Sequence, residues 1–500
     1  MLRDLRHATR LLAIARCFAR HNALFPFELV PAARPLLTIL RPFTDTRAPG
    51  RPGERLAAAL QELGPAFIKL GQSLATRADL LGDAICRDLA LLQDKLPSFP
   101  AAAARRIVAS ELEAPLEALF TSFEDEPVAA ASIAQVHFAV STEGEPLAVK
   151  ILRPGIEQAI EADIDFFLWI AEWVERTQPP LRRYRPVANV LMLRTSTRRE
   201  MDLRLEAAAA TELAQNCAED EGFRVPAVDW RRTAQRVVSF ARVSGLRADD
   251  RAALLAAGLD PDQILATSAR VFFNQVFRDG FFHGDMHPGN MLVAEDGAVV
   301  ALDFGIMGRL DLATRRNLAL ILLGFLTRDY VQVADVFFRI GMVPGDQDRA
   351  AFTQACRAIG EPIFGRPLNE ISFGRLLGQL LHVAEQFDME AKPELLLLQK
   401  TMVVAEGVGR ALNPNVNMWQ LAQPLVEEWM RANLGPEAQV REALADVMEA
   451  ARLLPSLVRD ANSLAVSLAA RPPPPATRGG SPWWLAAMLA VGLLLGLALG

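Results

Sequence analysis

Two short motifs in the second half of the chain carry side chains suited to phosphoryl transfer. The first is His283-Gly-Asp-Met-His-Pro-Gly-Asn290, and the second is Asp303-Phe-Gly305. Asp285 can accept the proton of an attacking hydroxyl group. Asn290 and Asp303 offer the hard oxygen ligands that Mg²⁺ takes when it carries nucleotide phosphates. The motifs together predict a nucleotide site with Asp285 as the catalytic base and Asn290 and Asp303 as metal ligands.

The segment between the motifs indicates how their side chains meet. Two short apolar runs, 291–294 and 298–302, flank the turn Glu295-Asp-Gly297. This pattern predicts a β-hairpin, and its folding would bring Asn290 and Asp303 together at the open end. The alternative is a loop whose aspartate and asparagine only bond to backbone donors.

The two histidines of the first motif allow a second interpretation. His283 and His287, with Asp285 as a third ligand, could form a zinc site. The chain has no helical His-Glu motif of the zinc-hydrolase kind, and a histidine in a loop more often anchors the backbone. We therefore favour the nucleotide site over the zinc site.

A nucleotide site needs a cation for the phosphates, and Lys150 lies upstream in the apolar run 147–152. This run follows another, 136–140, and the turn 142–145, so both runs are predicted to be strands. A strand lysine before the aspartate loop is the order found in kinases, and we expect Lys150 to contact the α- and β-phosphates. The alternative is a solvated charge at a sheet edge.

The segment before Lys150 is rich in alanine where kinases have a glycine-rich phosphate loop. Alanine costs about 0.5–1 kcal/mol where glycine-like freedom is needed, so this loop cannot drape over phosphates in the same way. An isolated run of this kind is more often helical. Because Lys150 follows, we expect a nucleotide loop in which Ser132 and Gln135 supply polar groups. The predicted nucleotide-binding residues are Ala129, Ala130, Ala131, Ser132, Ile133, Ala134, Gln135, Val136, His137 and Lys150.

A charged helix is predicted farther along the chain, over residues 198–210. Asp202 and Glu206 are four residues apart and would share one face of it. We expect Arg198 to pair with Asp202, which leaves Glu206 as the ion-pair partner of Lys150. The alternative is a solvated charged face.

These motifs together resemble the UbiB family of atypical kinases, the ADCK-like proteins of ubiquinone biosynthesis. The resemblance covers roughly residues 55–455 and extends upstream to Phe67-Ile-Lys-Leu-Gly-Gln72, which looks like the Lys-x-Gly-Gln signature of that family. It implies a two-lobed, protein-kinase-like α+β fold that binds ATP and Mg²⁺. It also implies a slow ATPase or an unorthodox kinase activity that supports coenzyme Q production.

The resemblance assigns a regulatory role to four further residues. In the family, the Lys-x-Gly-Gln element closes over the active site, pairs with a Glu-x-Asp motif and occludes the space for a protein substrate. These roles fall here on Lys69, Gln72, Glu200 and Asp202. The alternative is an amphipathic helix packed for stability. One departure is Ala241 in the expected hinge, where relatives tend to carry a glutamate.

The composition sets outer limits on the function. The chain has 500 residues, 51% apolar and 22% charged, with a net charge of −6. That length suffices for a two-lobed domain with extensions. A basic stripe with interleaved aromatic residues is missing, so we expect no nucleic-acid partner. The four cysteines form no CxxC pair, which fits a reducing cytoplasmic environment.

We expect six segments along the chain. They are a basic amphipathic segment (1–54), a helical extension with the Lys-x-Gly-Gln element (55–127), a kinase-like N-lobe (128–245), a helical C-lobe with the catalytic and metal loops (246–468), a Pro/Gly-rich linker (469–482) and a C-terminal transmembrane helix (483–500). The last segment has no charge and would span about 27 Å as a helix. Arg471 and Arg478 precede it and predict a cytoplasmic catalytic domain on a bacterial-type inner membrane. The alternatives are a buried helix and a tight membrane hairpin.

The expected partners are membrane lipid and either quinone-biosynthesis proteins or lipid-soluble quinone intermediates. Two other functions stay open on the sequence. One is a small-molecule phosphotransferase of the aminoglycoside or choline kinase type, which shares the His-x-Asp loop. The other is a non-catalytic scaffold that uses nucleotide occupancy to organise a quinone-biosynthetic complex.

Overall fold

The structure, a computed structural model, describes most of the chain up to Leu434. The described residues are 2–25, 37–38, 42, 44–75, 81–89, 97–179, 182, 185–364, 379, 383, 386–387, 389, 392–413 and 418–434. The chain divides into one unit from Met1 to Met430 and a second from Arg431 to Gly500. The predicted linker and transmembrane helix, 469–500, lie outside the described residues. None of the helices in the described part has the length and apolar character needed to cross a bilayer.

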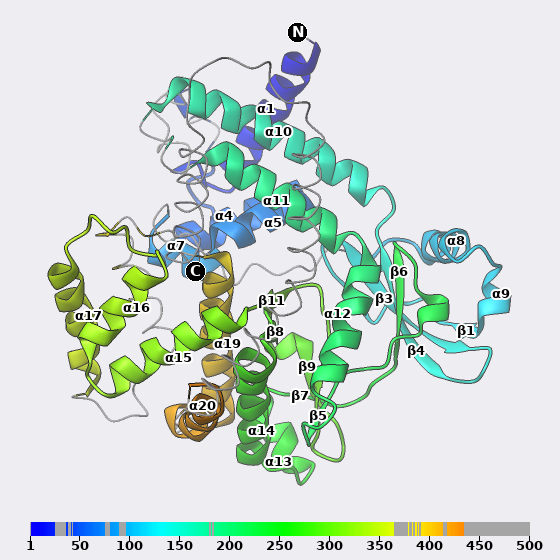
Figure 1. Cartoon of the computed structure of the whole chain (residues 1–500). Coiled ribbons are helices and arrows are strands. Elements are labelled where there is room, and N and C mark those ends of the chain that lie inside the picture. The colour runs from blue at the N-terminus through cyan, green and yellow to red at the C-terminus, as the bar shows by residue number, and fades with distance from the viewer. Residues whose placement is uncertain are drawn as a thin grey trace, which may run out of the picture. The chain divides into compact units, whose positions relative to one another are not determined.

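An antiparallel sheet forms the centre of the predicted N-lobe, and it contains the lysine strand (Figure 1). The strands lie in the order β1-β3-β4-β6, with β2 paired to β3. Lys150 lies opposite Val136 and Val238, so the strand prediction is confirmed. The sheet begins at β1, before the predicted boundary at residue 128. The strands are β1 (Phe120–Phe123), β2 (Ala129–Ala130), β3 (Ala134–Ser141), β4 (Pro146–Leu152) and β6 (Val237–Ala241).

The two faces of this sheet pack against different helices. Alternation along β4 sends Val149 and Ile151 to one face and Lys150 to the other. Val149 and Ile151 join an apolar cluster with Ile107 and Val108 of α8. Figure 1 shows α12 on the opposite side of the sheet from α8. The helices are α8 (Ala101–Glu111), α9 (Leu116–Leu119) and α12 (Leu203–Asn216).

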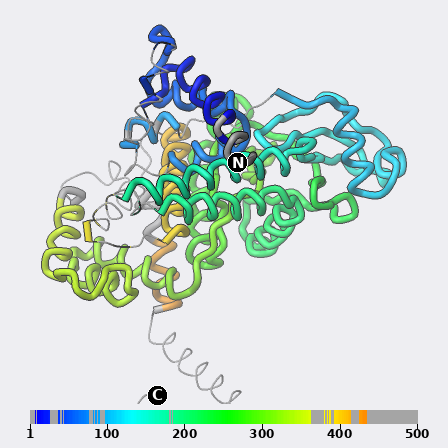
Figure 2. The backbone as a smooth tube through the Cα atoms, turned by 90° about the horizontal axis from the view of Figure 1, so that it is seen from above, coloured from blue at the N-terminus to red at the C-terminus, as the bar shows by residue number. Residues whose placement is uncertain are grey.

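The N-terminal helices share one apolar core with the long helical hairpin α10–α11. Figure 2 shows the backbone of these segments from above. Phe67 of α5 packs edge-on against Phe167 of α10, with ring centroids 4.9 Å apart. The same cluster includes Ala207 of α12 and Val238 of β6. The helices are α1 (Leu2–Arg20), α4 (Pro52–Leu63), α5 (Pro65–Leu74), α7 (Asp83–Leu89), α10 (Ile156–Thr177) and α11 (Pro186–Glu200).

The charged helix predicted over 198–210 is interrupted, so that prediction was wrong in part. Helix α11 ends at Glu200, and Asp202 becomes the N-cap of α12, where its side chain accepts the Arg204 N–H. A short aspartate side chain favours this capping position over a helix interior. Arg198 pairs with Glu161 of α10 rather than with Asp202.

The second lobe combines short strands with helices. Its sheet has the order β5-β10-β9-β7, and β11 pairs with β8. The helical character predicted for the C-lobe, 246–468, is confirmed within the described residues, although short strands are interspersed. The strands are β5 (Phe223–Arg224), β7 (Leu246–Arg247), β8 (Phe281–His283), β9 (Met291–Val293), β10 (Val299–Ala301) and β11 (Met307–Arg309). The helices are α13 (Arg251–Ala256), α14 (Pro261–Phe273), a π-helix (Asn274–Asp279), α15 (Leu312–Leu326), α16 (Tyr330–Arg339), α17 (Arg349–Phe364), α19 (Pro393–Leu412) and α20 (Met418–Leu434).

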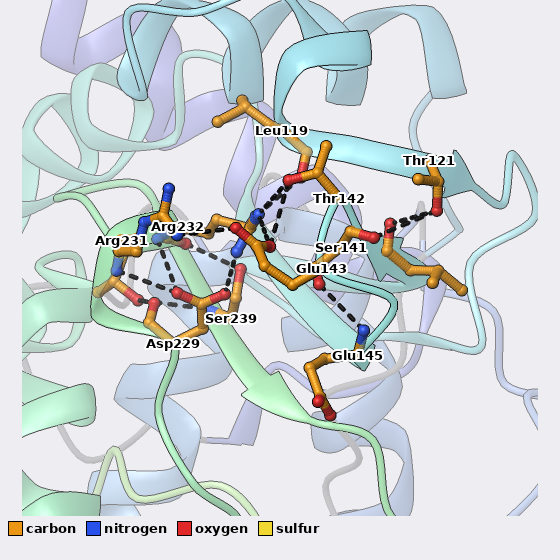
Figure 3. Close-up of polar contacts among 12 residues, drawn as sticks. Leu119, Thr121, Ser141, Thr142, Glu143, Glu145, Asp229, Arg231, Arg232 and Ser239 are labelled. Atoms are coloured by element: carbon orange, nitrogen blue, oxygen red, sulfur yellow. Dashed lines mark hydrogen bonds and ion pairs between the residues drawn. The ribbon is translucent and has the colours of Figure 1, made fainter.

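A buried arginine, Arg232, connects the short 3-10 helix before β6 to the rest of the N-lobe (Figure 3). Arg232 donates to the Leu119 carbonyl at 2.8 Å, to Asp229 Oδ2 at 2.6 Å and to Thr142 Oγ1 at 3.0 Å. It also bonds to Glu143 and holds the pKa of that carboxyl at about 2. This network joins three segments at one end of the sheet.

Replacing Arg232 by methionine is expected to destabilise the N-lobe by about 1.5–3 kcal/mol, because it removes a buried guanidinium whose hydrogen bonds to charged acceptors hold the network together. Arg231→Met is the matched control. Arg231 pairs with the same Glu143, but its side chain is 78% exposed against 5% for Arg232. An exposed pair contributes at most about 1 kcal/mol. Thermal unfolding of the two purified variants should show a large loss only for Arg232→Met, and equal midpoints would contradict the role of the network.

Candidate active site

The hairpin predicted between the two motifs is present. β9 and β10 pair antiparallel, with Met291 opposite Ala301, and the turn is closed by Gly297 at a φ of 84°. This left-handed conformation is one that glycine adopts at little cost. The Leu302 N–H donates to the Asn290 carbonyl at 2.8 Å. The hairpin therefore places Asn290 and Asp303 at its open end, as the spacing of the motifs predicted.

Lys150 lies between two carboxylates. Its Nζ is 2.8 Å from Glu206 Oε1 and 3.1 Å from Asp303 Oδ2. Burial alone would lower the pKa of Lys150, but Asp303 and Glu206 outweigh it and raise that pKa. Burial also raises the pKa of Glu206, an effect that Lys150 partly offsets. The predicted ion pair of Lys150 with Glu206 is present, and it connects β4, α12 and the second lobe.

Asp303 is ionised, as a metal ligand must be. It is one of few non-glycine residues with a positive φ, 55°, a conformation that places strain at the start of this motif. Its Oδ1 accepts the Gly305 N–H at 3.1 Å. Burial would raise the pKa of Asp303, but Lys150 and that hydrogen bond lower it well below its usual range. The Asp303 carboxylate is therefore charged at neutral pH and able to bind a cation.

The buried His283 anchors the catalytic loop rather than a metal. Its Nε2 is 2.8 Å from the Asp303 carbonyl oxygen, and its Nδ1 accepts the Asp285 N–H at 3.1 Å. Burial lowers the pKa of His283, so the ring is neutral. His287 Nδ1 accepts the Gly289 N–H at 3.0 Å. Because both ring nitrogens of His283 are bonded to the backbone, the alternative zinc site is not supported.

Asp285 has a partner that sequence reasoning missed. Lys400 Nζ, on α19, donates to Asp285 Oδ1 at 2.9 Å. Asn290 Nδ2 donates to the Asp285 backbone carbonyl at 3.1 Å, which ties the predicted base to the predicted metal ligand. The two aspartates and the asparagine thus lie on two connected loops. Lys400 is 115 residues from Asp285 in sequence, and no motif around it signals the contact.

The alanine-rich segment forms a tight strand connection instead of a helix. β2 and β3 pair antiparallel, and the Ala131 N–H donates to the Ala134 carbonyl at 2.8 Å. Arg153 Nη2 donates to the Ala131 carbonyl at 2.8 Å, and this bond holds the turn in place. Ser132 is buried, and its hydroxyl has no hydrogen-bond partner in the described part of the chain. Buried hydroxyl groups normally have a hydrogen-bond partner, so this one, next to the strand of Lys150, is available to bond to a ligand.

Two of the predicted nucleotide residues face away from Lys150. Alternation along β3 puts Val136 on the Lys150 face and Gln135 and His137 on the other. Gln135 Nε2 is 2.7 Å from His137 Nε2, and His137 Nδ1 is 2.8 Å from the Glu124 carbonyl oxygen. The expectation that the Gln135 side chain contacts nucleotide is therefore not supported. Both side chains instead connect β3 to the part of the chain that precedes this strand.

The Lys-x-Gly-Gln element contacts the Glu-x-Asp motif through an ion pair. Lys69 Nζ on α5 is 2.8 Å from Glu200 Oε2 at the end of α11, and both side chains are largely buried. Gln72 follows one turn later on the same helix. Asp202 instead bonds to Arg204, which lowers the pKa of Asp202. The structure thus places Lys69 beside Glu200, whereas Asp202 caps the start of α12.

The expected hinge passes from β6 to β7. The Ala241 N–H donates to the Ala227 carbonyl at 2.8 Å, and the Arg242 N–H donates to the Pro146 carbonyl at 2.9 Å. These backbone donors are already engaged within the protein. Adenine recognition at this hinge would therefore use other backbone groups than these two.

The site as a whole fits a nucleotide carried by Mg²⁺. A charged Asp303 and the amide of Asn290 supply oxygen donors, and Lys150 supplies a cation between the lobes. Ser132 adds a buried hydroxyl that has no hydrogen-bond partner among the described residues. This donor set matches the metal and phosphate ligands of phosphoryl-transfer enzymes. Fold and site together define a protein of the kinase-like class.

Comparisons with known proteins agree with this class. The family model described as ABC1 atypical kinase-like domain matches residues 91–337, and the UbiB helical domain matches residues 356–417. The protein named "Probable protein kinase UbiB" of Marinobacter nauticus is 40% identical over 462 residues, which cover 90% of this chain and 84% of that protein. The protein of that name from Shewanella piezotolerans is 41% identical over 416 residues, covering 82% and 76%. The chain belongs to the UbiB family of atypical kinases.

One solved structure is also similar in outline. It is described as "The complex structure of Rv3197-erythromycin from Mycobacterium tuberculosis". It is 24% identical, covers 79% of this chain and 95% of its own, and superposes with a TM-score of 0.49.

Proposed function

We propose that this protein binds ATP with Mg²⁺ and acts as an atypical kinase or ATPase that supports ubiquinone biosynthesis. The observation that carries the proposal is the placement of Lys150 between Glu206 and Asp303, with Nζ 2.8 Å and 3.1 Å from their oxygens. In kinases this lysine must be fixed by a helix carboxylate while the aspartate of the second motif holds the metal. Family membership supports the same function.

Each residue then has a definite task. Lys150 and the turn between β2 and β3 hold the phosphates, and Asn290 and Asp303 hold Mg²⁺, which neutralises charge on the phosphates when it is bound. Asp285 accepts the proton of the attacking hydroxyl or water. In this scheme these residues do not determine which acceptor receives the phosphate.

We also propose a membrane location for this activity. The segment 483–500, outside the described residues, would anchor the protein in a bacterial-type inner membrane with the kinase-like domain in the cytoplasm. Membrane lipid would be the immediate partner. Quinone-biosynthesis proteins or lipid-soluble quinone intermediates would be reached from that position.

The Lys69–Glu200 pair is proposed to keep a protein substrate out of the site. It fastens α5 to α11, and α5 shares its apolar cluster with Ala207 and Val238, on the Lys150 side of the sheet. An element fixed over that side leaves small acceptors and water as substrates. This arrangement favours slow ATP hydrolysis over protein phosphorylation.

Breaking this pair is expected to increase phosphorylation of the protein by itself. In Lys69→Met, the closed position of α5 loses a largely buried ion pair, and a loss of about 1.4 kcal/mol would raise the open population roughly tenfold. Lys69→Arg, which keeps the charge, is the control and should stay near wild type. Transfer of labelled phosphate from ATP to the protein measures the effect. Unchanged transfer in Lys69→Met would argue against occlusion by α5.

The proposed pathway role is tested by quinone content in cells. The chromosomal copy is deleted and replaced by wild type, Lys150→Ala or Asp285→Asn at equal membrane levels. We expect ubiquinone to fall in the deletion and in both variants. Unchanged ubiquinone in the deletion would refute the pathway role, and a loss in the deletion with full rescue by Asp285→Asn would favour the non-catalytic scaffold.

A further inference from the structure

The catalytic loop has no lysine or arginine of its own. Between Asp285 and Asn290 the chain has only methionine, histidine, proline and glycine. The positive charge beside Asp285 comes instead from Lys400 on α19, whose Nζ is 2.9 Å from Asp285 Oδ1. This helix lies within the segment matched by the UbiB helical domain. A residue of the helical domain thus reaches the predicted catalytic base.

Helix α19 is fixed against the catalytic loop next to this lysine. The buried Thr401 hydroxyl lies 3.0 Å from the Gly284 carbonyl oxygen and 2.9 Å from the Leu397 carbonyl oxygen of its own helix, and its one proton is shared between these two acceptors. A Cβ atom at Gly284 would come within 2.9 Å of the Leu397 side chain, so the helix and the loop are in direct contact. Figure 1 shows α19 beside β8, the strand that leads into this loop, and beside β11, the strand paired with β8.

The far end of α19 is fixed as well. Arg251 Nε donates to the Leu412 carbonyl at 2.7 Å, and Asn413 Nδ2 donates to Asp262 Oδ1 at 2.9 Å. Both partners lie at the starts of C-lobe helices, α13 and α14. The position of the Lys400 backbone therefore does not depend on the side chain of Lys400.

The two oxygens of Asp285 have different surroundings. Oδ1 is bonded to Lys400, whereas Oδ2 is 3.8 Å from His287 Nε2, beyond hydrogen-bonding distance. His283 accepts a hydrogen bond from the backbone N–H of Asp285, so this bond does not involve the Asp285 carboxylate. Lys150, the other lysine of the site, is engaged with Glu206 and Asp303.

We propose that Lys400 is a positioning residue for phosphoryl transfer, which holds Asp285 Oδ1 so that Oδ2 faces the acceptor. The inference rests on the proposed function and adds the helical domain to the active site. The acceptor oxygen forms a bond to the γ-phosphorus while its proton passes to Asp285 Oδ2. The bond from the γ-phosphorus to the bridging oxygen breaks, and ADP leaves with that electron pair. Lys400 takes part only through Asp285.

The test compares steady-state ATP hydrolysis and nucleotide affinity of the full-length protein and four variants. They are Lys400→Met, Lys400→Arg, Asp285→Asn and the double variant Lys400→Met/Asp285→Asn. Lys392→Met is the matched control, because Lys392 is an exposed lysine at the start of the same helix. Mg-ATP affinity is measured by titration, and the melting temperature of each variant is recorded.

We expect Lys400→Met to lower kcat by about 10- to 100-fold, the cost of a misplaced catalytic group, with KM and Mg-ATP affinity changed less than about twofold. Lys400→Arg should recover most of kcat, and Lys392→Met should match wild type. The double variant should lose no more than Asp285→Asn alone, because both changes remove the same function.

Three results would overturn the inference. They are an unchanged kcat in Lys400→Met, a loss that Lys400→Arg does not recover, and additive losses in the double variant. A large loss in Asp285→Asn with none in Lys400→Met would refute the inference alone. The absence of Mg-ATP binding by the wild-type protein would instead refute the proposed function.

Discussion

Replacing Asp303 by asparagine is expected to lower Mg²⁺-dependent ATP hydrolysis by at least about 10²- to 10³-fold, the usual cost of removing one charged or polar group that stabilises a transition state. Asparagine keeps the shape of the side chain but removes the charge that faces the metal and Lys150. The pKa of the Asp303 carboxyl lies well below its usual range, so this charge is present at neutral pH. Hydrolysis and Mg-ATP affinity should fall together.

Asp296→Asn is the matched control for this variant. Asp296 lies in the turn of the same β9–β10 hairpin, where its Oδ1 accepts the Ala298 N–H at 3.2 Å. Asparagine can make the same bond, so activity should stay near wild type. If Asp303→Asn hydrolysed ATP at the wild-type rate with unchanged dependence on Mg²⁺, Asp303 could not be the metal ligand.

Asp285→Asn is expected to lower kcat by about 10²- to 10⁴-fold, the range that general base catalysis supplies. Its amide cannot accept the proton of the acceptor. Mg-ATP affinity should change little, because Asn290 bonds to the backbone carbonyl of Asp285, which the substitution leaves unchanged. Single-turnover hydrolysis and nucleotide titration separate the two effects. A variant that hydrolyses ATP normally would remove Asp285 from the chemistry and leave nucleotide occupancy as the functional signal.

The sequence was sufficient to predict the parts of the site that are close in the chain. The hairpin between Asn290 and Asp303 follows from alternating short runs and an Asp-Gly turn, which are local signals. The pairing of Lys150 with Glu206 was also predicted from the sequence and is present, although the reason given for it, a pairing of Arg198 with Asp202, was wrong. The Lys69–Glu200 pair came from the family resemblance.

The parts that were missed depend on tertiary contacts. The side of the sheet on which Gln135 and His137 lie is set by the register of β3 against β4, and a change of one residue reverses it. The break between α11 and α12 arises because Asp202 caps a helix, where periodicity favoured continuation. Lys400 approaches Asp285 from a helix far along the chain, and no local pattern encodes that contact.

The most direct test of the nucleotide site is equilibrium titration of ATP into the purified full-length protein, with Mg²⁺ and with the metal removed by a chelator. Wild type, Lys150→Met and the surface control Lys392→Met are compared. We predict Mg²⁺-dependent binding in wild type and Lys392→Met, and an affinity reduced about tenfold or more in Lys150→Met, since a charge-assisted bond of about 1.5–3 kcal/mol is lost. Equal binding by Lys150→Met, or no binding by wild type, would contradict the assignment of this site.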